Sequence, residues 1–337
     1  MKVAMYYNNE DIRIEEQEIP KISEDEILVK VIASGICGSD VMEWYRLKKA
    51  PCVLGHEVTG IIEKVGKNVK KFKEGDRVMV THHVPCNKCH YCLQNEETVC
   101  ETLRKTNFYP GGFSQYLRVP KINVEKGTFL LPKKISFEEG TFIEPLACVV
   151  RGQRKAQIKK MQRILIIGSG VTGLLHLQLA KIKEVKKISV IDINKYRLNF
   201  AKKFGADEII ISVKGKKIEE KFDKVIVCTG AKEAIQESLS YLDKGGSVLF
   251  FAPSDPKFKI SFNFNDFWFK CGKIITSYAA VKEDIEEAIN LIKLGRINVK
   301  DMITHKLGLE DIQKGFNIVS TAKKSMKVII KPNDFLG

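Results

Sequence analysis

The chain has 337 residues, more than a single hydrophobic core usually supports, so two domains are expected. Hydrophobic residues make up 44% of the sequence and charged residues 29%, a balance that excludes a disordered or fibrous protein. The formal net charge is +15, from 56 Lys and Arg against 41 Asp and Glu. The lysines are interspersed with glutamates and accompany no nucleic-acid-binding motif, so we expect a solvated basic surface and no nucleic-acid partner.

The sequence contains no obvious targeting segment. Residues 1–7 are followed at once by polar residues, and no later stretch reaches the ~18 apolar residues of a membrane span. We therefore expect no membrane partner and a cytoplasmic location. In that compartment the nine cysteines stay reduced unless a metal holds them.

The first part of the chain, to about residue 144, has the pattern of an all-β domain. Short β-branched runs alternate with turns, and glycines punctuate the runs. The predicted strands are 27–33, 58–65, 77–80 and 113–119.

From about residue 150, strand and helix patterns alternate, which predicts a parallel, doubly wound sheet and an α/β fold class. In chain order we predict a strand at 163–167, a helix at 174–182, a strand at 187–192, a helix at 195–204, strands at 208–212 and 224–229, a helix at 232–242, strands at 247–252 and 273–279, and a helix at 284–294. Residues 303–332 have a mixed pattern.

Four cysteines lie close together in a polar, loop-like segment. Cys86, Cys89, Cys92 and Cys100 follow the spacing Cys-x2-Cys-x2-Cys-x7-Cys. Four thiolates close a tetrahedral shell around zinc and leave no open position, so this metal is expected to be structural. An iron–sulfur cluster is the alternative.

A glycine-rich loop follows the predicted strand 163–167 and opens a helix. Gly168, Gly170 and Gly173 form a Gly-x-Gly-x-x-Gly pattern that also contains Val171 and Thr172. In this context the glycines permit a tight turn and a close approach of the pyrophosphate to the helix N-terminus. The loop therefore predicts a dinucleotide site.

Asp192 ends the next predicted strand, where an acidic side chain accepts hydrogen bonds from the adenosine ribose hydroxyls and repels a 2′-phosphate. This favours NAD over NADP. Arg197 is a further cofactor-binding candidate, and because an arginine also suits a phosphate, NADP remains the alternative. Asp192 could instead cap the following helix, in competition with Asn194.

A second set of metal-ligand residue types lies in the β-rich part. Cys37 belongs to the segment Cys37-Gly38-Ser39-Asp40, and His56 and Glu57 follow Gly55. Cysteine, histidine and carboxylate are suitable zinc ligands, and three protein ligands leave a position open for water or substrate.

Taken together, these motifs resemble the zinc-containing medium-chain dehydrogenases, and within them the branch of sorbitol, threonine and galactitol-phosphate dehydrogenases. The resemblance covers nearly the whole chain. It rests on motifs in the family's order: Gly35 to Asp40, Gly55 to Glu57, the four cysteines, Gly111-Gly112-Phe113, Ile143 to Leu146 and the glycine loop. It implies a β-rich, GroES-like catalytic domain at 1–146, completed by 281–337, and a Rossmann NAD-binding domain at 147–280.

The resemblance also implies a catalytic zinc on Cys37 and His56, with Glu57 as the third direct ligand. Glu144 then lies beside this metal and binds it through water or exchanges with Glu57. With the four-cysteine site, this makes two zinc ions per subunit. A homotetramer or homodimer is implied as well.

In the family mechanism, Ser39 is the first proton acceptor and Asp40 orients His56. The chain departs from many relatives at Met42, where they carry a histidine that relays the proton to solvent. Glu43, His82, the cofactor ribose or a water chain are the possible replacements. A second departure is the absence of the substrate-binding arginine of sorbitol dehydrogenases, in whose place residues 277–280 read Ser-Tyr-Ala-Ala.

The predicted function is the zinc-dependent transfer of hydride to NAD from a secondary alcohol such as a polyol, sugar alcohol or related hydroxy compound. Two alternatives remain open. One is a carbonyl reductase of the same family. The other, from a different class, is a non-catalytic, zinc-stabilised dinucleotide-binding protein.

Overall fold

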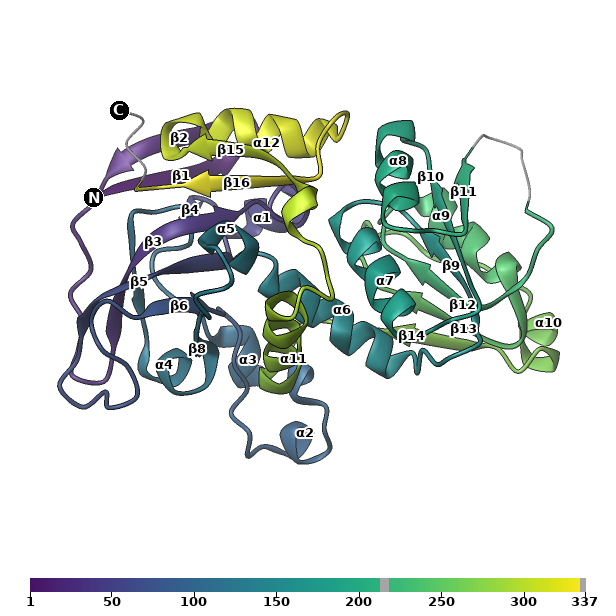
Figure 1. Cartoon of the computed structure of the whole chain (residues 1–337), viewed down its shortest axis with the longest axis horizontal. Coiled ribbons are helices and arrows are strands. Elements are labelled where there is room, and N and C mark those ends of the chain that lie inside the picture. Colours follow the sequence, from purple (N-terminus) through teal and green to yellow (C-terminus); the bar gives the residue numbers. More distant parts are fainter. Residues whose placement is uncertain (213–217, 334–337) are drawn as a thin grey trace. The chain divides into compact units, whose positions relative to one another are not determined.

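The structure is a computed structural model that describes residues 1–212 and 218–333. The chain divides into two compact units (Figure 1). The first consists of Met1–Ala147 together with Ala279–Gly337, and the second is Cys148–Tyr278. No helix within the described ranges is both long enough and apolar enough to cross a membrane.

The first unit is built on two β-sheets. A three-stranded sheet has the order β2-β1-β4, and a seven-stranded sheet has the order β15-β16-β3-β5-β6-β8, with β7 paired to β3. The strands are β1 (Lys2–Asn8), β2 (Asp11–Glu16), β3 (Ile27–Gly35), β4 (Cys52–Val53), β5 (Glu57–Val65), β6 (Arg77–Val80), β7 (Tyr116–Val119), β8 (Thr128–Leu130), β15 (Ile303–Gly308) and β16 (Lys327–Lys331).

Most helices of the first unit are short and lie in the connections between strands. They are α1 (Glu43–Arg46), α2 (His90–Leu93), α3 (Glu101–Lys105), α4 (Lys121–Gly127), α5 (Phe137–Gly140), α11 (Lys282–Lys293) and α12 (Ile312–Thr321). Helix α6 (Ile143–Lys155) contains the boundary between the units. The mixed pattern of residues 303–332 thus resolves into the segment β15-α12-β16.

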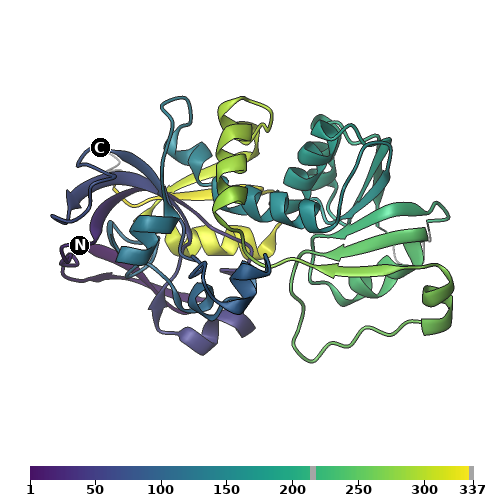
Figure 2. The same ribbon diagram turned by 90° about the horizontal axis from the view of Figure 1, so that it is seen from below.

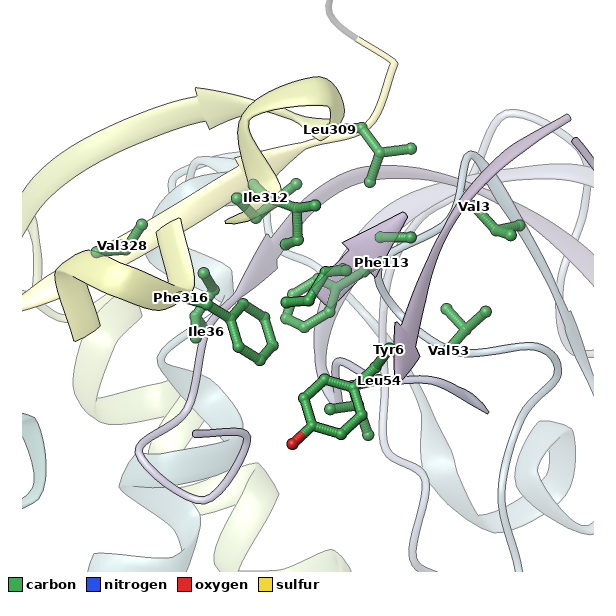
Figure 3. Packing of buried hydrophobic residues seen from close by; sticks show 13 residues of the cluster. Val3, Tyr6, Ile36, Val53, Leu54, Phe113, Leu309, Ile312, Phe316 and Val328 are labelled. Carbon is green, nitrogen blue, oxygen red and sulfur yellow. The ribbon is translucent and has the colours of Figure 1, made fainter. Parts of the chain in front are cut away.

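A hydrophobic cluster of the first unit holds the segments that carry the candidate metal ligands. Ile36, directly before Cys37, and Leu54, two residues before His56, are both buried in it (Figure 3). From the C-terminal segment, Phe316 of α12 packs against Phe113 with the ring centroids 5.9 Å apart. Apolar burial therefore fixes both ligand segments against the C-terminal part of the chain.

The second unit is a sheet with helices packed around it (Figure 2). The sheet has six strands, all parallel, in the order β11-β10-β9-β12-β13-β14. Its strands are β9 (Arg163–Ile167), β10 (Lys187–Asp192), β11 (Glu208–Ile211), β12 (Phe222–Val227), β13 (Leu242–Phe250) and β14 (Lys273–Thr276). The order reverses between β9 and β12, which is where doubly wound sheets bind ligands at the carboxyl ends of their strands. The predicted doubly wound sheet is confirmed.

Helices of the second unit connect these strands: α7 (Val171–Ile182), α8 (Lys195–Lys203), α9 (Lys232–Ser238) and α10 (Phe264–Phe269). The predicted helix 232–242 is one residue too long, because α9 continues as a 3-10 helix over Leu239–Tyr241 and β13 begins at Leu242. The predicted strand 247–252 is correspondingly too short. Gly245 and Gly246 lie inside the strand, with Gly245 at a φ of 72°.

Two candidate metal centres and a dinucleotide loop

The four predicted zinc ligands converge in one lobe of the first unit. Cys89 precedes α2, Cys92 lies in α2, and Cys100 directly precedes α3. The Sγ atoms of Cys89 and Cys92 are 3.5 Å apart, those of Cys86 and Cys100 are 3.6 Å apart, and those of Cys86 and Cys92 are 3.9 Å apart. All four ligand atoms form one group suited to a metal ion.

These distances fit a single tetrahedral ion. Zinc–sulfur bonds of about 2.3 Å place the sulfurs of a tetrahedron about 3.8 Å apart. Thiolates of a multi-iron cluster bind different irons and therefore lie further apart than the sulfurs of this lobe. The geometry favours zinc over an iron–sulfur cluster.

The surroundings of the thiols in this lobe shift their pKa values in different directions. Burial raises the pKa of Cys92 to about 12. Burial also opposes ionisation of Cys100, but backbone N–H groups of Cys86 and Leu103 lower its pKa to about 6. An N–H group of Lys88 lowers the pKa of Cys86. Backbone donors directed at sulfur therefore favour the thiolate form that binds metal.

The second candidate metal site is formed where β3 and β5 pair. Their antiparallel register places Gly35 opposite Glu57, so Cys37 just after β3 meets His56 just before β5. Ligand atoms of Cys37, His56 and Glu57 all lie within 4.8 Å of one another. Three ligands of these types suit a zinc ion with an open coordination position.

Glu57 also has a cationic partner that sequence reasoning missed. Lys327 of β16 donates from its Nζ to Glu57 Oε2, and both side chains are 1% exposed. A Cβ atom at Gly35 would collide with both side chains, so a glycine there admits the pair. The sequence shows only that Lys327 begins the segment Lys-Val-Ile-Ile-Lys, whose last residue is also a lysine, so nothing marked Lys327 as a partner of Glu57.

Asp40 lies behind His56, as the resemblance implied. Its side chain is fully buried, and its Oδ1 is 3.4 Å from His56 Nδ1, which leaves Nε2 of the imidazole for a metal. Its Oδ2 accepts from the backbone N–H of Cys37 at 3.0 Å. Burial opposes ionisation of Asp40, yet the neighbouring His56 ring, Arg46 guanidinium and Cys37 N–H lower its pKa.

Ser39 lies beside Cys37, the first of the candidate metal ligands. Its Oγ is 3.4 Å from the Sγ of Cys37, to which it donates. Arg46, at the end of α1, donates from Nη2 to Ser39 Oγ at 2.9 Å and to Asp40 Oδ1 at 3.0 Å. Sequence reasoning missed Arg46, because nothing in the spacing shows that α1 returns its last side chain to Ser39.

Glu43 and His82, the two side chains that could replace the missing relay histidine, lie in different surroundings. Glu43 is exposed and accepts from the backbone N–H of Asn9 at 3.1 Å. The ring of His82 lies 5.0 Å from that of His56 and 3.7 Å from that of His83. Burial lowers the pKa of His82 well below its usual value. Of these two side chains, only His82 lies next to a candidate metal ligand.

Glu144 is the second residue of α6 and is partly buried. It is not among the residues whose ligand atoms gather within 4.8 Å of one another. The arrangement of Cys37, His56 and Glu57 therefore does not include Glu144 as a direct ligand. That Glu144 binds the metal through water, or exchanges with Glu57 as ligand, stays a prediction.

The glycine loop of the second unit connects β9 to α7. Gly168 has a φ of 98°, which favours glycine, and a Cβ at Gly173 would overlap the carbonyl oxygen of Gly168. A Cβ at Gly170 would meet only Arg197, at 3.6 Å from Nη1, so that glycine faces space which a pyrophosphate could fill. Val171 and Thr172 are the first two residues of α7.

Asp192 ends β10, as predicted, but it also holds the glycine loop. Its Oδ2 accepts from the backbone N–H of Ser169 at 2.6 Å and from Ser169 Oγ at 2.9 Å. Its Oδ1 accepts from the N–H of Asn194. The cap of α8 is Asn194, whose side chain accepts from the N–H groups of Tyr196 and Arg197, so the alternative of Asp192 as the cap is wrong.

Comparisons with known proteins agree with this geometry. Residues 23–130 match the family described as "Alcohol dehydrogenase GroES-like domain", and residues 171–293 match "Zinc-binding dehydrogenase". The expected fold class, a GroES-like domain and a Rossmann domain, is confirmed. L-threonine 3-dehydrogenase of Bacillus licheniformis is 31% identical, over 93% of this chain and 93% of its own. D-xylulose reductase A of Aspergillus oryzae is 30% identical, over 95% and 93%.

Two solved structures with bound cofactor are also similar. The alcohol dehydrogenase RspB of Escherichia coli CFT073, in complex with NADH, has a TM-score of 0.88 at 26% identity, covering 98% of this chain and 99% of that one. A structure from Sinorhizobium meliloti 1021, described as a zinc-binding dehydrogenase bound to NADP, has a TM-score of 0.86 at 26% identity, covering 98% and 99%. Both nicotinamide cofactors therefore occur among similar structures.

Proposed function

This chain belongs to the zinc-containing alcohol dehydrogenase family and is an oxidoreductase of that family, and from this premise we propose that it oxidises a secondary hydroxyl group of a polyol, sugar alcohol or related hydroxy compound with NAD. The observation that carries the proposal is the group formed by Cys37, His56 and Glu57. Three ligands form an open metal site, which a purely structural zinc would not need.

Each residue of the site has a proposed role. Cys37, His56 and Glu57 hold the catalytic zinc, and Glu144 assists through water or by exchange with Glu57. Zinc there would polarise the hydroxyl oxygen of the substrate, and NAD would accept the hydride. Ser39 takes the hydroxyl proton and passes it on, because a serine cannot keep it. Asp40 fixes the orientation of the His56 ring.

The second unit is the proposed NAD-binding domain and the first the catalytic domain. We assign the pyrophosphate to the loop of Gly168, Gly170 and Gly173 at the start of α7, with Val171 and Thr172 supplying backbone N–H groups. Asp192 favours NAD over NADP through its negative charge. The guanidinium group of Arg197 lies near Gly170 and would contact the phosphate side of the cofactor.

A structural zinc on Cys86, Cys89, Cys92 and Cys100 completes the proposal, giving two zinc ions per subunit. The sulfur geometry of the lobe supports it. We also propose a cytoplasmic location, because a group of four thiolates that could hold a metal suits a compartment that keeps cysteines reduced.

The proposed assembly is a homodimer or homotetramer. Strand β14 ends the sheet order, and α10 just before it exposes Phe264, Trp268 and Phe269 by 62–70%. Exposed aromatic side chains beside a sheet edge suit contact with a second copy. Light scattering should give two or four times the chain mass of 38.2 kDa, and Trp268→Lys should lower it.

A screen of alcohols tests the proposed reaction. Zinc-loaded protein is mixed with NAD and, in turn, with xylitol, sorbitol, D-arabinitol, galactitol 1-phosphate, L-threonine and 2,3-butanediol, and NADH is followed by its absorbance. We expect turnover with at least one of them and none in Cys37→Ala. The reverse assay, with NADH and the matching carbonyl compounds, tests the reductase alternative.

The result of this screen separates the classes of function. Turnover of carbonyl compounds alone would favour a reductase. If protein with two bound zinc ions binds NAD but turns over nothing in either direction, a non-catalytic dinucleotide-binding protein replaces the proposal.

A further inference from the structure

We propose that Arg46 is a positioning residue that fixes the proton acceptor Ser39 and the carboxylate behind His56 in one arrangement. The inference rests on the proposed function, because it concerns the same site. It goes further in assigning a role to a side chain that lies outside the metal ligands.

One guanidinium group joins two functional side chains. Arg46 donates from Nε to the backbone carbonyl of Ser39 at 2.9 Å and from Nη2 to Ser39 Oγ at 2.9 Å. The same Nη2 donates to Asp40 Oδ1 at 3.0 Å. Both the main chain and the side chain of Ser39 are therefore held by one rigid fork.

The fork is itself held in place. The side chain of Arg46 is only 11% exposed, and its guanidinium carbon lies 4.8 Å from the ring centroid of Tyr45. Asp40, its ionic partner, is completely buried. A desolvated arginine between a ring and a buried carboxylate keeps one position, unlike an exposed surface arginine.

This arrangement decides how Ser39 can handle a proton. A guanidinium group only donates hydrogen bonds and does not give up its charge in a protein. Arg46 thus occupies one lone pair of Ser39 Oγ and leaves the other for the substrate hydroxyl. The hydroxyl hydrogen of Ser39 cannot point at Arg46, and in the structure it points at the Sγ of Cys37. When Ser39 passes on its own proton, that proton therefore moves away from Arg46.

Arg46 also pairs with the Asp40 carboxylate, which contacts His56, a candidate metal ligand. Asp40 contacts His56 Nδ1 with the same oxygen that accepts from Arg46. Without the guanidinium group, this carboxylate would keep only the His56 ring and the Cys37 N–H as partners. The positive charge of Arg46 near Ser39 would favour loss of the hydroxyl proton of the substrate.

The test compares Arg46→Met with Arg46→Lys. Lysine keeps the charge but lacks the fork, so it should retain more activity than methionine. We expect Arg46→Met to lower kcat by about a hundredfold, within the range for positioned proton transfer, while KM changes less than about threefold. The zinc content of both variants should remain two ions per chain. Adding millimolar guanidinium to Arg46→Met should restore at least about a tenth of the lost kcat.

Arg13→Met is the matched control. Arg13 also pairs with a carboxylate, Asp11 at 2.8 Å, and also lies over a tyrosine ring, Tyr7, at 4.4 Å. Its contacts involve no residue of the candidate site. The control should therefore keep kcat and KM within about twofold of the unchanged protein.

A readout without catalysis separates this inference from the proposed function. In zinc-free protein, the unfolding midpoints of Arg46→Met, Asp40→Asn and the double variant should be clearly non-additive, because the two side chains interact directly. Additive effects, or an unchanged kcat in Arg46→Met with two zinc ions bound, would overturn the positioning role. If no alcohol is oxidised but the unfolding midpoints are non-additive, the proposed function is wrong, while the interaction between Arg46 and Asp40 is supported.

Discussion

Lys327 and Glu57 form a buried ammonium–carboxylate pair directly beside the candidate catalytic metal site. Both side chains are 1% exposed, and the Nζ of Lys327 lies 5.4 Å from the ring centroid of Phe142. Glu57 therefore offers one oxygen to the lysine while it remains within reach of Cys37 and His56. The lysine compensates the charge of Glu57, and a metal bound by Glu57 would share that charge with the lysine.

Loss of this lysine should matter most in zinc-free protein. Lys327→Met leaves the Glu57 carboxylate buried without a cation, which should lower the free energy of unfolding by about 3–5 kcal/mol. Bound zinc supplies a replacement charge, so the loss should shrink in the zinc-loaded form. Chemical unfolding of both forms measures the difference.

Lys331→Met is the control for this change. Lys331 lies on the same strand, 3.8 Å from Glu138, with its side chain 24% exposed. Its replacement should cost less than about 1 kcal/mol in either form. Equal destabilisation of zinc-free and zinc-loaded protein by Lys327→Met would show that Glu57 does not reach the metal.

The two metal centres should respond differently to loss of a thiolate. Cys37→Ala and Cys89→Ala should each reduce zinc from two ions to one per chain by atomic absorption. Cys37→Ala should abolish turnover with little change in melting temperature. Cys89→Ala should lower the melting temperature first, because zinc binding at the four-cysteine lobe contributes to its folding.

Cys271→Ala, at an exposed thiol, should change neither the zinc content nor the melting temperature. The assignment of the two centres would be reversed by a Cys89→Ala protein that keeps its stability but loses turnover.

Asp192 should govern the choice of cofactor. Asp192→Ala removes the acceptor for the ribose hydroxyls, so kcat/KM for NAD should fall about tenfold to a hundredfold, equivalent to about 1.5–3 kcal/mol. The value for NADP should fall less or rise, since repulsion of the 2′-phosphate disappears. Steady-state kinetics with both cofactors measures this.

Ser169→Ala is the matched control, because it removes one contact of Asp192 with the glycine loop and leaves the carboxylate in place. It should affect NAD and NADP equally. An equal loss with both cofactors in Asp192→Ala would mean that Asp192 acts only by holding the loop.

A buried histidine in the second unit should make stability depend on pH. Burial, assisted by the charge of Lys183, lowers the pKa of His176 to about 3. An unfolded histidine titrates near 6.5, so between pH 3 and about 6.5 the unfolded chain binds more protons than the folded one. Stability from this group is complete above about pH 6.5 and declines as the pH falls toward 3, by up to about 1.4 kcal/mol per pH unit.

His176→Leu should flatten this part of the pH profile of unfolding. An identical slope in His176→Leu and the unchanged protein between pH 4.5 and 6.5 would contradict the assignment.

Features local in the sequence were predicted well. The four cysteines lie within fifteen positions and the glycine loop within six, so their spacing alone predicted that the four sulfurs gather and that the chain turns at the glycines. Cys37 and His56 are further apart. The residues suggested a metal site, but its completeness depends on the β3–β5 register that places Gly35 opposite Glu57.

Contacts that depend on the path of the chain were missed. Lys327 is 270 residues from Glu57 and reaches it only because β16 pairs with β3. Arg46 is close in sequence to Ser39, but its direction is set by the short helix α1 and by Tyr45. The hydrogen bonds of Asp192 to Ser169 likewise depend on the pairing of β9 with β10, which no local pattern shows.

The most direct test of the whole account is X-ray diffraction from crystals of the zinc-loaded protein at wavelengths above and below the zinc absorption edge. We expect two anomalous peaks per chain, one among the four cysteine sulfurs and one between Cys37 and His56 with Glu57 beside it. An active protein with a single peak, at the four cysteines, would contradict the claim that Cys37, His56 and Glu57 hold a catalytic metal.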